Sequence, residues 1–559
     1  MGASASSEQG SPEQKEAESL AASLGALPML KKAFSLLAAA DDHDPQSNSI
    51  PIVSLQQLFT FKSHQKSNSG GGGGGLKNFD QLLTQLGPSI VDHFFLANAN
   101  DHDHDHDDKG DGITYVQFLR GYVKCCGRSS TASSFNNLFR ILTAAVTRAG
   151  LPPKLEFESE DTDYKMSGSF TPHDILLFLS LCWIMSFDSK TQQQEEEVPA
   201  LPDLDHLLLS AVESCSEESN NETNSFWNCD LDLDLQLSAG KVLLWALKTT
   251  PNLADCTAQF VHGRLQKSVE DKSSEVDLSS EADDSSSSSN LLTKGMVWAI
   301  SLTLTSTLRQ EILKAFLPSS NNADDGNNYD RLIYRSSVHG KGMNRFWSNV
   351  EGYNGPTLII LAARFEDDDD NDNDGVTSKR CIVGVLTNQG FENKDTYYGS
   401  QGSLYAISPA FHVFSSHGKD KNFVYTHLHP TGRVYEPHPK PVGIAFGGSI
   451  GGNERIFIDE DFAKVTFRHH AVDKTYQHGP LFPGQGFLAV EAVVSEVEVW
   501  GLGGSHARKF QNSFKQREEL FTNQRRKVDL KTFGNWEDSP EKMMMDMISD
   551  PNHVRREER

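Results

Sequence analysis

The chain has 559 residues, enough for two or three domains with sizeable cores. Acidic residues outnumber basic ones by 76 to 51, and the formal net charge is −25. This balance argues against nucleic acid as the main partner, because phosphate binding needs clustered Lys and Arg. The seven cysteines are odd in number and irregular in spacing, which argues against a disulfide framework and favours a reducing compartment. No uncharged apolar run reaches the roughly eighteen residues of a transmembrane helix.

The N-terminus, MGASAS, matches the N-myristoylation pattern, with Gly2 exposed once Met1 is removed and Ser6 at the favoured position. A start of small residues without lipid would look the same, and we expect residues 1–19 to be disordered. A single myristoyl chain gives only marginal membrane binding, and the residues that follow are acidic rather than basic. The sequence therefore predicts peripheral membrane association that needs a protein partner for stable attachment.

Residues 20–265 carry apolar side chains at helical spacing and predict an all-α region. Within it, DYKMSGSFTPHD resembles an EF-hand calcium loop, with Asp163, Ser167 and Asp174 at ligand positions one, five and twelve. Lys165 stands at the third position, where its ammonium would repel the ion, and an Asp replaces the bidentate Glu at the twelfth. We expect an EF-hand-like scaffold in which calcium is a weak possibility and no cofactor is required.

A second loop, DDKGDGITYVQF from Asp107, also resembles a degenerate EF-hand. Its Ile113 comes one residue early, and Gln117 stands where a calcium loop has glutamate. Just before it, Asp and His alternate over residues 101–108, which could suggest a metal site. A metal site needs a rigid set of supporting groups, so a solvated low-complexity loop explains this pattern better.

Residues 266–290 are rich in Ser and Asp, and we interpret them as a linker. Residues 291–318 are predicted to form one helix that ends at Pro318. From Tyr329 the pattern changes to β-branched and aromatic runs separated by glycine, which predicts strands. The strand candidates are TLIILAARF, CIVGVLTN, NFVYTHL, GIAFGG, RIFID and VEAVVSEVEVW.

The order of motifs over residues 291–505 resembles the TLDc domain. The motifs are RLIYRSSVHGKGMNRFWSNVEGYNGPTLIIL, IVGVLTNQGF, KPVGIAFGGSIGGNERIFIDEDF and GFLAVEAVVSEVEVWGL. Gly447 and Gly448 match the family's central glycine signature, while Glu496 and Glu498 alternate with valines on the last strand, as on a half-buried edge strand. The resemblance implies a β-sandwich of two antiparallel sheets with flanking helices, so the whole chain is expected to be of the α+β class.

Histidines gather in this β-rich region, and together with Glu491, Glu496 and Glu498 they could suggest acid–base or metal chemistry. Their spacing matches no zinc-protease motif, and the region has no nucleophile elbow, phosphate-binding loop or CxxC pair. The glycines of the signature do not lead from a strand into a helix, so tight turns explain them better than a nucleotide site. We therefore expect no catalytic residue. The histidines are His427, His429, His438, His469, His470 and His478.

The combination of an N-myristoylation pattern, an EF-hand-like region, a TLDc-like domain and a charged, partly helical extension at 506–559 is most similar to the lysosome-associated TLDc proteins. That resemblance implies binding to the vacuolar-type proton ATPase on the cytosolic face of a lysosomal or vacuolar membrane. It also implies a link to oxidative-stress resistance or growth signalling, and no nucleic acid is expected. Candidate contact residues, chosen because they are aromatic or basic, are Phe346, Trp347, Tyr397, Tyr398, Arg525 and Arg526.

Two other classes of function stay open. One is a calcium-responsive adaptor in which the Asp163 loop senses the ion. The other is a stress-protective enzyme, whose reactive thiol would have to be Cys381, the one cysteine of the β-rich region. Cys381 lies within an apolar strand, where a thiolate is disfavoured.

Overall fold

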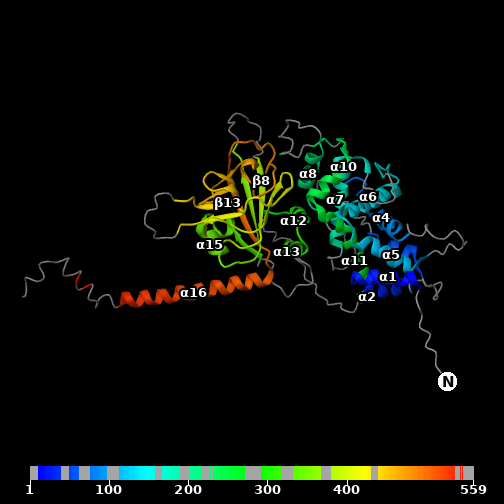
Figure 1. Cartoon of the computed structure of the whole chain (residues 1–559), viewed down its shortest axis with the longest axis horizontal. Helices are drawn as coiled ribbons and strands as arrows, with labels where there is room; N and C mark the ends of the chain where they lie inside the picture. Colours follow the sequence, from blue (N-terminus) through cyan, green and yellow to red (C-terminus); the bar gives the residue numbers. More distant parts are fainter. Residues whose placement is uncertain are drawn as a thin grey trace, which may run out of the picture.

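The computed structural model places a helical half beside a β domain, and one long helix leaves the β domain (Figure 1). The helical half is residues 11–270, and the β domain is residues 291–503. Structural statements concern the residues that the structure describes, which are 11–38, 49–61, 76–96, 112–157, 166–188, 201–216, 227, 231–232, 234–270, 291–316, 331–366, 379–429, 439–534, 542 and 544.

The helical half is built from helices whose apolar faces share one core, as the helical spacing predicted. Helix α4 continues into a π-helix, and α11 is preceded by a 3-10 helix. α11 ends at Val269, a few residues inside the predicted linker. The helices are α1 (Pro12–Ser23), α2 (Leu27–Ala38), α3 (Ile52–Phe59), α4 (Phe79–Val91) with the π-helix Asp92–Leu96, α5 (Tyr115–Cys126), α6 (Thr131–Arg148), α7 (Pro172–Asp188), α8 (Asp205–Cys215), α10 (Ala239–Thr249), the 3-10 helix Pro251–Asp255 and α11 (Cys256–Val269).

Short strands join the loops of the helical half in pairs, so the all-α prediction is wrong in this respect. Ile50 lies opposite Ile113 in the antiparallel pair β1–β2, and both side chains are buried. Phe170 lies opposite Leu237 in the pair β4–β5, again with both side chains buried. Because a helix follows each of these four strands, helix–loop–helix units are coupled two by two. The strands are β1 (Ser49–Pro51), β2 (Gly112–Thr114), β3 (Leu155–Phe157), β4 (Met166–Phe170) and β5 (Leu237–Ser238).

Helix α1 begins inside the segment for which we expected disorder. The Ser11 hydroxyl accepts a hydrogen bond from the Gln14 N–H (3.2 Å), and Pro12 takes the first helical position. Ala17 and Ala21 are buried in the core of the helical half. The prediction of disorder is therefore wrong from Pro12 onward.

The β domain contains one continuous antiparallel sheet of 11 strands, where two sheets were expected. Hydrogen bonds connect the strands in the order β11-β10-β8-β7-β16-β15-β14-β13-β12-β9, and β6 pairs with β16. The sheet curls, so that strands from both ends of this order share one core. The strands are β6 (Leu332–Arg335), β7 (Thr357–Arg364), β8 (Arg380–Thr387), β9 (Lys394–Tyr398), β10 (Gly402–Ser408), β11 (His412–Ser415), β12 (Val424–His427), β13 (Gly443–Ser449), β14 (Asn453–Asp459), β15 (Lys464–Phe467) and β16 (Val490–Gly501).

Strands β7, β8 and β10 are buried on both faces, which explains their uninterrupted apolar sequences. On β7, Ile359 and Leu361 belong to the core inside the curled sheet. Leu358 and Ile360, on the opposite face, belong to the core of the helical half. The two halves of the molecule therefore share this part of the sheet as a common wall.

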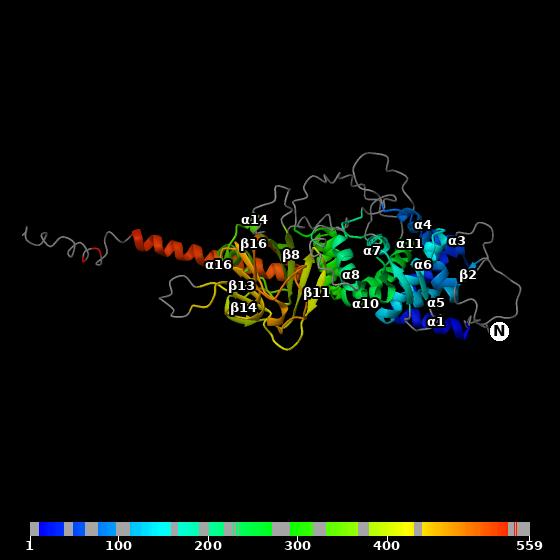
Figure 2. The same cartoon turned by 90° about the horizontal axis from the view of Figure 1, so that it is seen from above.

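Helix α12 (Lys294–Ser301) lies in the seam between the two halves (Figure 1). Its Trp298 is fully buried and packs edge-on against Trp183 of α7, with ring centroids 5.5 Å apart. Further along the seam, the Phe411 N–H donates to the carbonyl of His206 (2.9 Å). Figure 2 shows β11 beside α8 and α10 at this point.

The single helix expected over residues 291–318 is two helices. α12 ends at Ser301, and α13 (Ser306–Phe316) follows after a short turn. The hydroxyls of Ser301 and Thr303 each donate to the carbonyl three residues earlier, at 2.7 Å. Such side-chain bonds offer the backbone an alternative to continued helix, which accounts for the break.

The remaining helices of the β domain are α14 (Ser336–His339) and α15 (Met343–Val350), and α16 (Gly504–Gly534) follows β16. α16 has 31 residues and extends away from the domain (Figure 1). In its first two turns Ala507 and Gln511 are buried against the domain. Among the described residues, no helix combines the length and the apolar character needed to cross a membrane.

Candidate functional site

Gly447 and Gly448 of the glycine signature lie near the end of β13, just before the tight turn that leads into β14. Gly447 and Gly448 both have positive φ, +65° and +70°, a conformation that side chains with a Cβ rarely adopt. A Cβ on Gly447 would lie 2.6 Å from an oxygen of Asp473, and one on Gly448 would lie 1.9 Å from the carbonyl oxygen of Asn453. Both the backbone conformation and the close approach therefore require glycine here.

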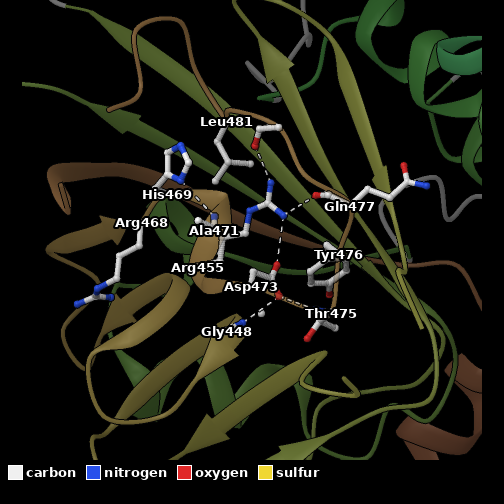
Figure 3. A network of polar contacts seen from close by, with 12 residues as sticks. Gly448, Arg455, Arg468, His469, Ala471, Asp473, Thr475, Tyr476, Gln477 and Leu481 are labelled. Atoms are coloured by element: carbon white, nitrogen blue, oxygen red, sulfur yellow. Dashed lines mark hydrogen bonds and ion pairs between the residues drawn. The ribbon is translucent and has the colours of Figure 1, made fainter. Parts of the chain in front are cut away.

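Beneath this turn lies a fully buried ion pair between Arg455 and Asp473 (Figure 3). The Arg455 Nη1 atom is 3.2 Å from Asp473 Oδ2, and the guanidinium also donates to the carbonyls of Gln477 (2.9 Å) and Gly479 (2.8 Å). Asp473 Oδ1 accepts from the backbone N–H of Gly448 (3.1 Å) and from that of Thr475 (2.8 Å). Buried charges need such pairing and hydrogen bonding to be tolerated.

A second carboxylate occupies the N–H groups at the tip of the turn. Glu454 Oε1 accepts from the N–H of Gly451 (2.7 Å) and of Gly452 (3.2 Å), and Arg468 Nη1 lies 3.3 Å from Glu454 Oε2. Tyr397, half-buried on β9, donates to the carbonyl of Gly447 (2.6 Å). These backbone donors are already engaged by carboxylates of the chain itself. The tight turn predicted here holds Gly451 and Gly452, whereas Gly447 and Gly448 lie in β13, and the signature fastens segments of the domain together rather than offering a cradle for phosphate.

The other signature pair, Glu496 and Glu498, lies in the middle of the sheet. The half-buried edge expected for it is wrong, because β16 has β7 on one side and both β15 and β6 on the other. Arg335 binds both carboxylates, with Nε 2.8 Å from Glu496 and Nη2 2.9 Å from Glu498. Glu498 is fully buried and also accepts from the Trp500 indole (3.0 Å) and the Leu291 N–H (3.2 Å). Burial raises the pKa of Glu498, and these donors oppose that rise.

Three of the aromatic residues proposed as partner contacts are core residues. Phe346, Trp347 and Tyr398 are only 0%, 8% and 8% exposed, so they do not offer the surface that the sequence suggested. Phe346 packs edge-on against Tyr334 and Phe391 inside the curled sheet. Phe346 and Trp347 both lie on the buried face of helix α15. Residue type alone does not predict that burial.

The basic candidates Arg525 and Arg526 are exposed on α16, in the part that extends away from the domain. The same helix exposes two apolar side chains one turn earlier, Leu520 (62%) and Phe521 (61%). Large exposed apolar side chains next to arginine are typical of protein–protein contact surfaces.

An exposed apolar pair that the sequence analysis missed is Phe487 and Leu488, with exposed fractions of 81% and 82%. The ring of His469 stacks on Phe487 with centroids 4.0 Å apart. The last strand was predicted as VEAVVSEVEVW, and β16 does begin at Val490, so Phe487 and Leu488 precede the strand. The pair therefore belongs to the loop next to the Arg455–Asp473 network.

The described histidines of the β domain do not converge on a metal site, and His438 lies outside the described residues. Among the described residues, no group of three or more His, Cys, Asp or Glu is arranged to hold a metal ion. His470 lies between His469 and His478, with ring centroids 3.9 and 5.4 Å away. Cys381 is buried in β8, and burial raises the pKa of its thiol to about 12, which leaves little thiolate at neutral pH.

The described calcium candidates, Ser167 and Asp174, have different structural roles in the helical half. Asp163 lies outside the described residues, as does Gly2, the candidate myristoylation site. Ser167 pairs with Glu156 between β4 and β3. Asp174 caps α7, where its Oδ2 accepts from the Thr171 N–H (2.7 Å) and from Lys154 Nζ (2.7 Å). In the Asp107 loop, Gln117 plays the same capping role toward Thr114. Asp174 and Gln117, the two side chains compared with the last calcium ligand, are thus each engaged at a helix N-terminus.

Comparison with known proteins assigns the β domain. The model of the TLDc domain family matches residues 285–503, close to the range 291–505 predicted from the motifs. A protein of the yeast Kluyveromyces lactis, named restriction of telomere capping protein 5, is 24% identical over 239 residues. That alignment covers 36% of this chain and 42% of the yeast protein, so it spans less than half of the relative's length.

Proposed function

Because residues 285–503 are a TLDc domain, we propose that the protein is a non-catalytic regulator that binds the vacuolar-type proton ATPase. In this proposal the protein acts at the cytosolic face of a lysosomal or vacuolar membrane and changes the activity or assembly of the pump. A role in oxidative-stress resistance or growth signalling would follow from that control.

The observation that carries the proposal is the way α16 leaves the TLDc domain. Gln511 is fully buried and donates to the carbonyls of Asn349 (2.8 Å) and Glu351 (3.2 Å), so the start of the helix is fixed to the domain. The 31 residues of α16 correspond to about 46 Å of helix. Leu520 and Phe521 lie beyond the fixed part and are exposed. A docked domain with such an arm could contact a second subunit of a large assembly at the same time.

The loop pair Phe487–Leu488 gives the domain a contact surface of its own. The Arg455–Asp473 ion pair holds the loop that precedes it through the carbonyls of Gln477 and Gly479. A rigid loop that presents two large apolar side chains loses little conformational entropy on binding. We therefore place the docking surface of the TLDc domain at Phe487 and Leu488, and the second contact on α16.

Membrane attachment in this proposal comes from myristoylation of Gly2 together with the partner. A single acyl chain contributes only marginal affinity, but it raises the local concentration of the protein near a membrane-bound pump.

Co-purification tests the proposal. Full-length protein would be isolated from a lysate that contains cytosol and membranes, beside Gly2→Ala and a chain that ends at Ser505. We expect proton-pump subunits with the full-length protein, fewer with Gly2→Ala, and fewest without α16. Absence of pump subunits from a correctly folded full-length bait would contradict the proposal.

A calcium-responsive adaptor is a second candidate, favoured by the pairwise coupling of the helix–loop–helix units through β1–β2 and β4–β5. Calcium would have to draw Asp174 away from Thr171 and Lys154. Calorimetric titration of the full chain with calcium decides between the two candidates, because a silent titration ends the adaptor proposal.

A further inference from the structure

A cleft of about 280 Å³ lies in the seam between α10 of the helical half and β11 of the TLDc domain. Its polar lining comes from both halves: Ser214, Lys241 and Lys248 from one, and His412, Gln477 and His478 from the other. The site is separate from the Phe487–Leu488 pair and from α16. These residues take no part in the proposed pump binding.

The fold brings the basic groups of this cleft together in a defined way. Lys241 and Lys248 are seven residues apart on α10, so they lie on the same face of the helix two turns apart. Trp245, between them, is buried, and its indole donates to the Ser210 hydroxyl (2.9 Å), which fixes the orientation of α10. The lysines line the cleft beside Trp245, while Val242, Leu243 and Ala246 bury the other side of α10 in the core.

The wall on the side of the TLDc domain is equally well supported. The Nε2 atom of His412 is 2.8 Å from an oxygen of Glu213 on α8, which sets the orientation of the ring. The carbonyl of Gln477 accepts from Arg455 (2.9 Å), and its N–H donates to Ser415 (2.9 Å). The cleft floor is thus tied directly to the buried Arg455–Asp473 pair.

The charge of the lining is opposite to that of the whole molecule. The chain carries a formal charge of −25, yet among the described residues the cleft lining contains two lysines and no Asp or Glu. Glu213 hydrogen-bonds His412 but is not part of the lining. Lysine ammonium, imidazole N–H and serine hydroxyl groups are donors that suit a phosphoryl group, and the cleft is large enough for one or two such groups.

We propose that this cleft binds a small phosphorylated anion, either free in solution or as the headgroup of a membrane lipid. The anion would be held by Lys241 and Lys248 from the helical half and by His412 and His478 from the TLDc domain. Because its ligands come from both halves, binding would stabilise the seam and lock the orientation of the two halves.

Calorimetric titration of the full-length protein with pyrophosphate tests the free form. Vesicles of phosphatidylcholine with and without phosphatidylinositol 4-phosphate test the lipid form. The test variant is the double substitution Lys241→Gln with Lys248→Gln, and the conservative counterpart replaces both lysines by arginine. The control is Lys509→Gln, which removes one lysine charge from an exposed position on α16.

We expect saturable binding of at least one probe by the wild type, and a rise in its melting temperature with that probe. Affinity should fall at least about tenfold in the double glutamine variant, while the arginine variant and Lys509→Gln should bind like the wild type. Binding of pyrophosphate would identify a free anion, and binding of the phosphoinositide vesicles alone would identify a headgroup. Failure of the wild type to bind either probe, or equal binding by the double glutamine variant, would overturn the proposal.

Discussion

At the scale of single residues, the TLDc signature is a set of internal fastenings. Asp473 connects Gly448 near the end of β13 to Arg455, and Arg455 in turn holds the carbonyls of Gln477 and Gly479. Arg455 and Asp473 are both fully buried, so removing either side chain would leave the other charge buried without its partner.

We expect Asp473→Ala to lower the free energy of unfolding by about 3–5 kcal/mol, because it leaves the Arg455 charge buried without its partner. Lys464→Ala is the matched control, since it removes an ion pair with Glu491 in which both side chains are 64% exposed. That change should cost no more than about 1 kcal/mol. Urea unfolding of the two variants gives both values, and similar losses would show that the buried pair has no special role.

The glycines allow a second comparison at this scale. Gly448 and Gly418 have similar positive φ, +70° and +78°, but a Cβ would strike a carbonyl only at Gly448. Gly418→Ala should cost about 1–2 kcal/mol for backbone strain alone. Gly448→Ala should cost a further 1–3 kcal/mol or so for the clash. Thermal unfolding of both variants measures the difference, and equal melting temperatures would mean that the turn relaxes freely.

At the scale of elements, α16 has two parts with different tasks. Its start is held by Gln511 and by Phe514, which lies so close to Gly352 that a Cβ there would be 2.5 Å from the ring. Its later part exposes Leu520 and Phe521.

Leu520→Asp with Phe521→Asp should weaken pump binding at least about tenfold while leaving stability unchanged, because these side chains have solvent around them in the free protein. Thr522→Asp is the control, since it places a charge on the neighbouring exposed position of the same helix. Pull-down of pump subunits with each variant gives the comparison. Equal capture by both variants would exclude these side chains from the contact.

Sequence patterns predicted the long elements of the TLDc domain well and the short ones poorly. The run TLIILAARF is β7, and VEAVVSEVEVW lies within β16, because apolar strands of this length have few alternatives. The strands of the pairs β1–β2 and β4–β5 are only two to five residues long. They form by pairing between loops that are distant in sequence, so the local sequence pattern does not predict them.

The candidate site shows the same limit for side chains. Gly447 and Gly448 were identified because glycine type and position carry the signal. Phe346 and Trp347 were proposed as surface residues, yet tertiary packing buries them, while Phe487 is exposed although its apolar run resembles a strand.

At the scale of the whole molecule, the seam makes the two halves interdependent. His206 is buried in it, and the Phe411 N–H of the TLDc domain donates to its carbonyl. Burial lowers the pKa of His206 to about 4, and nearby Asp203 opposes that effect.

Because of His206, we expect the folded protein to lose stability at acid pH. The folded protein favours the neutral form of His206. The free energy of unfolding is therefore undiminished above the ordinary histidine pKa of about 6.5, and it decreases as the pH falls toward 4. At pH 5 the loss from His206 should be about 2 kcal/mol. His206→Gln should reduce the loss between pH 7 and pH 5, whereas the exposed His417→Gln should not. Urea unfolding at both pH values checks this, and an unchanged pH dependence in His206→Gln would contradict it.

Binding of the full-length protein to purified, intact vacuolar-type ATPase is the most direct test of the proposed function. Co-elution in size-exclusion chromatography would be measured for the wild type, for Phe487→Asp with Leu488→Asp, and for a chain that ends at Ser505. We predict a stable complex for the wild type and a weakened one for each variant. A folded wild-type protein that elutes apart from the pump would contradict the proposal that this protein regulates the proton ATPase by binding it.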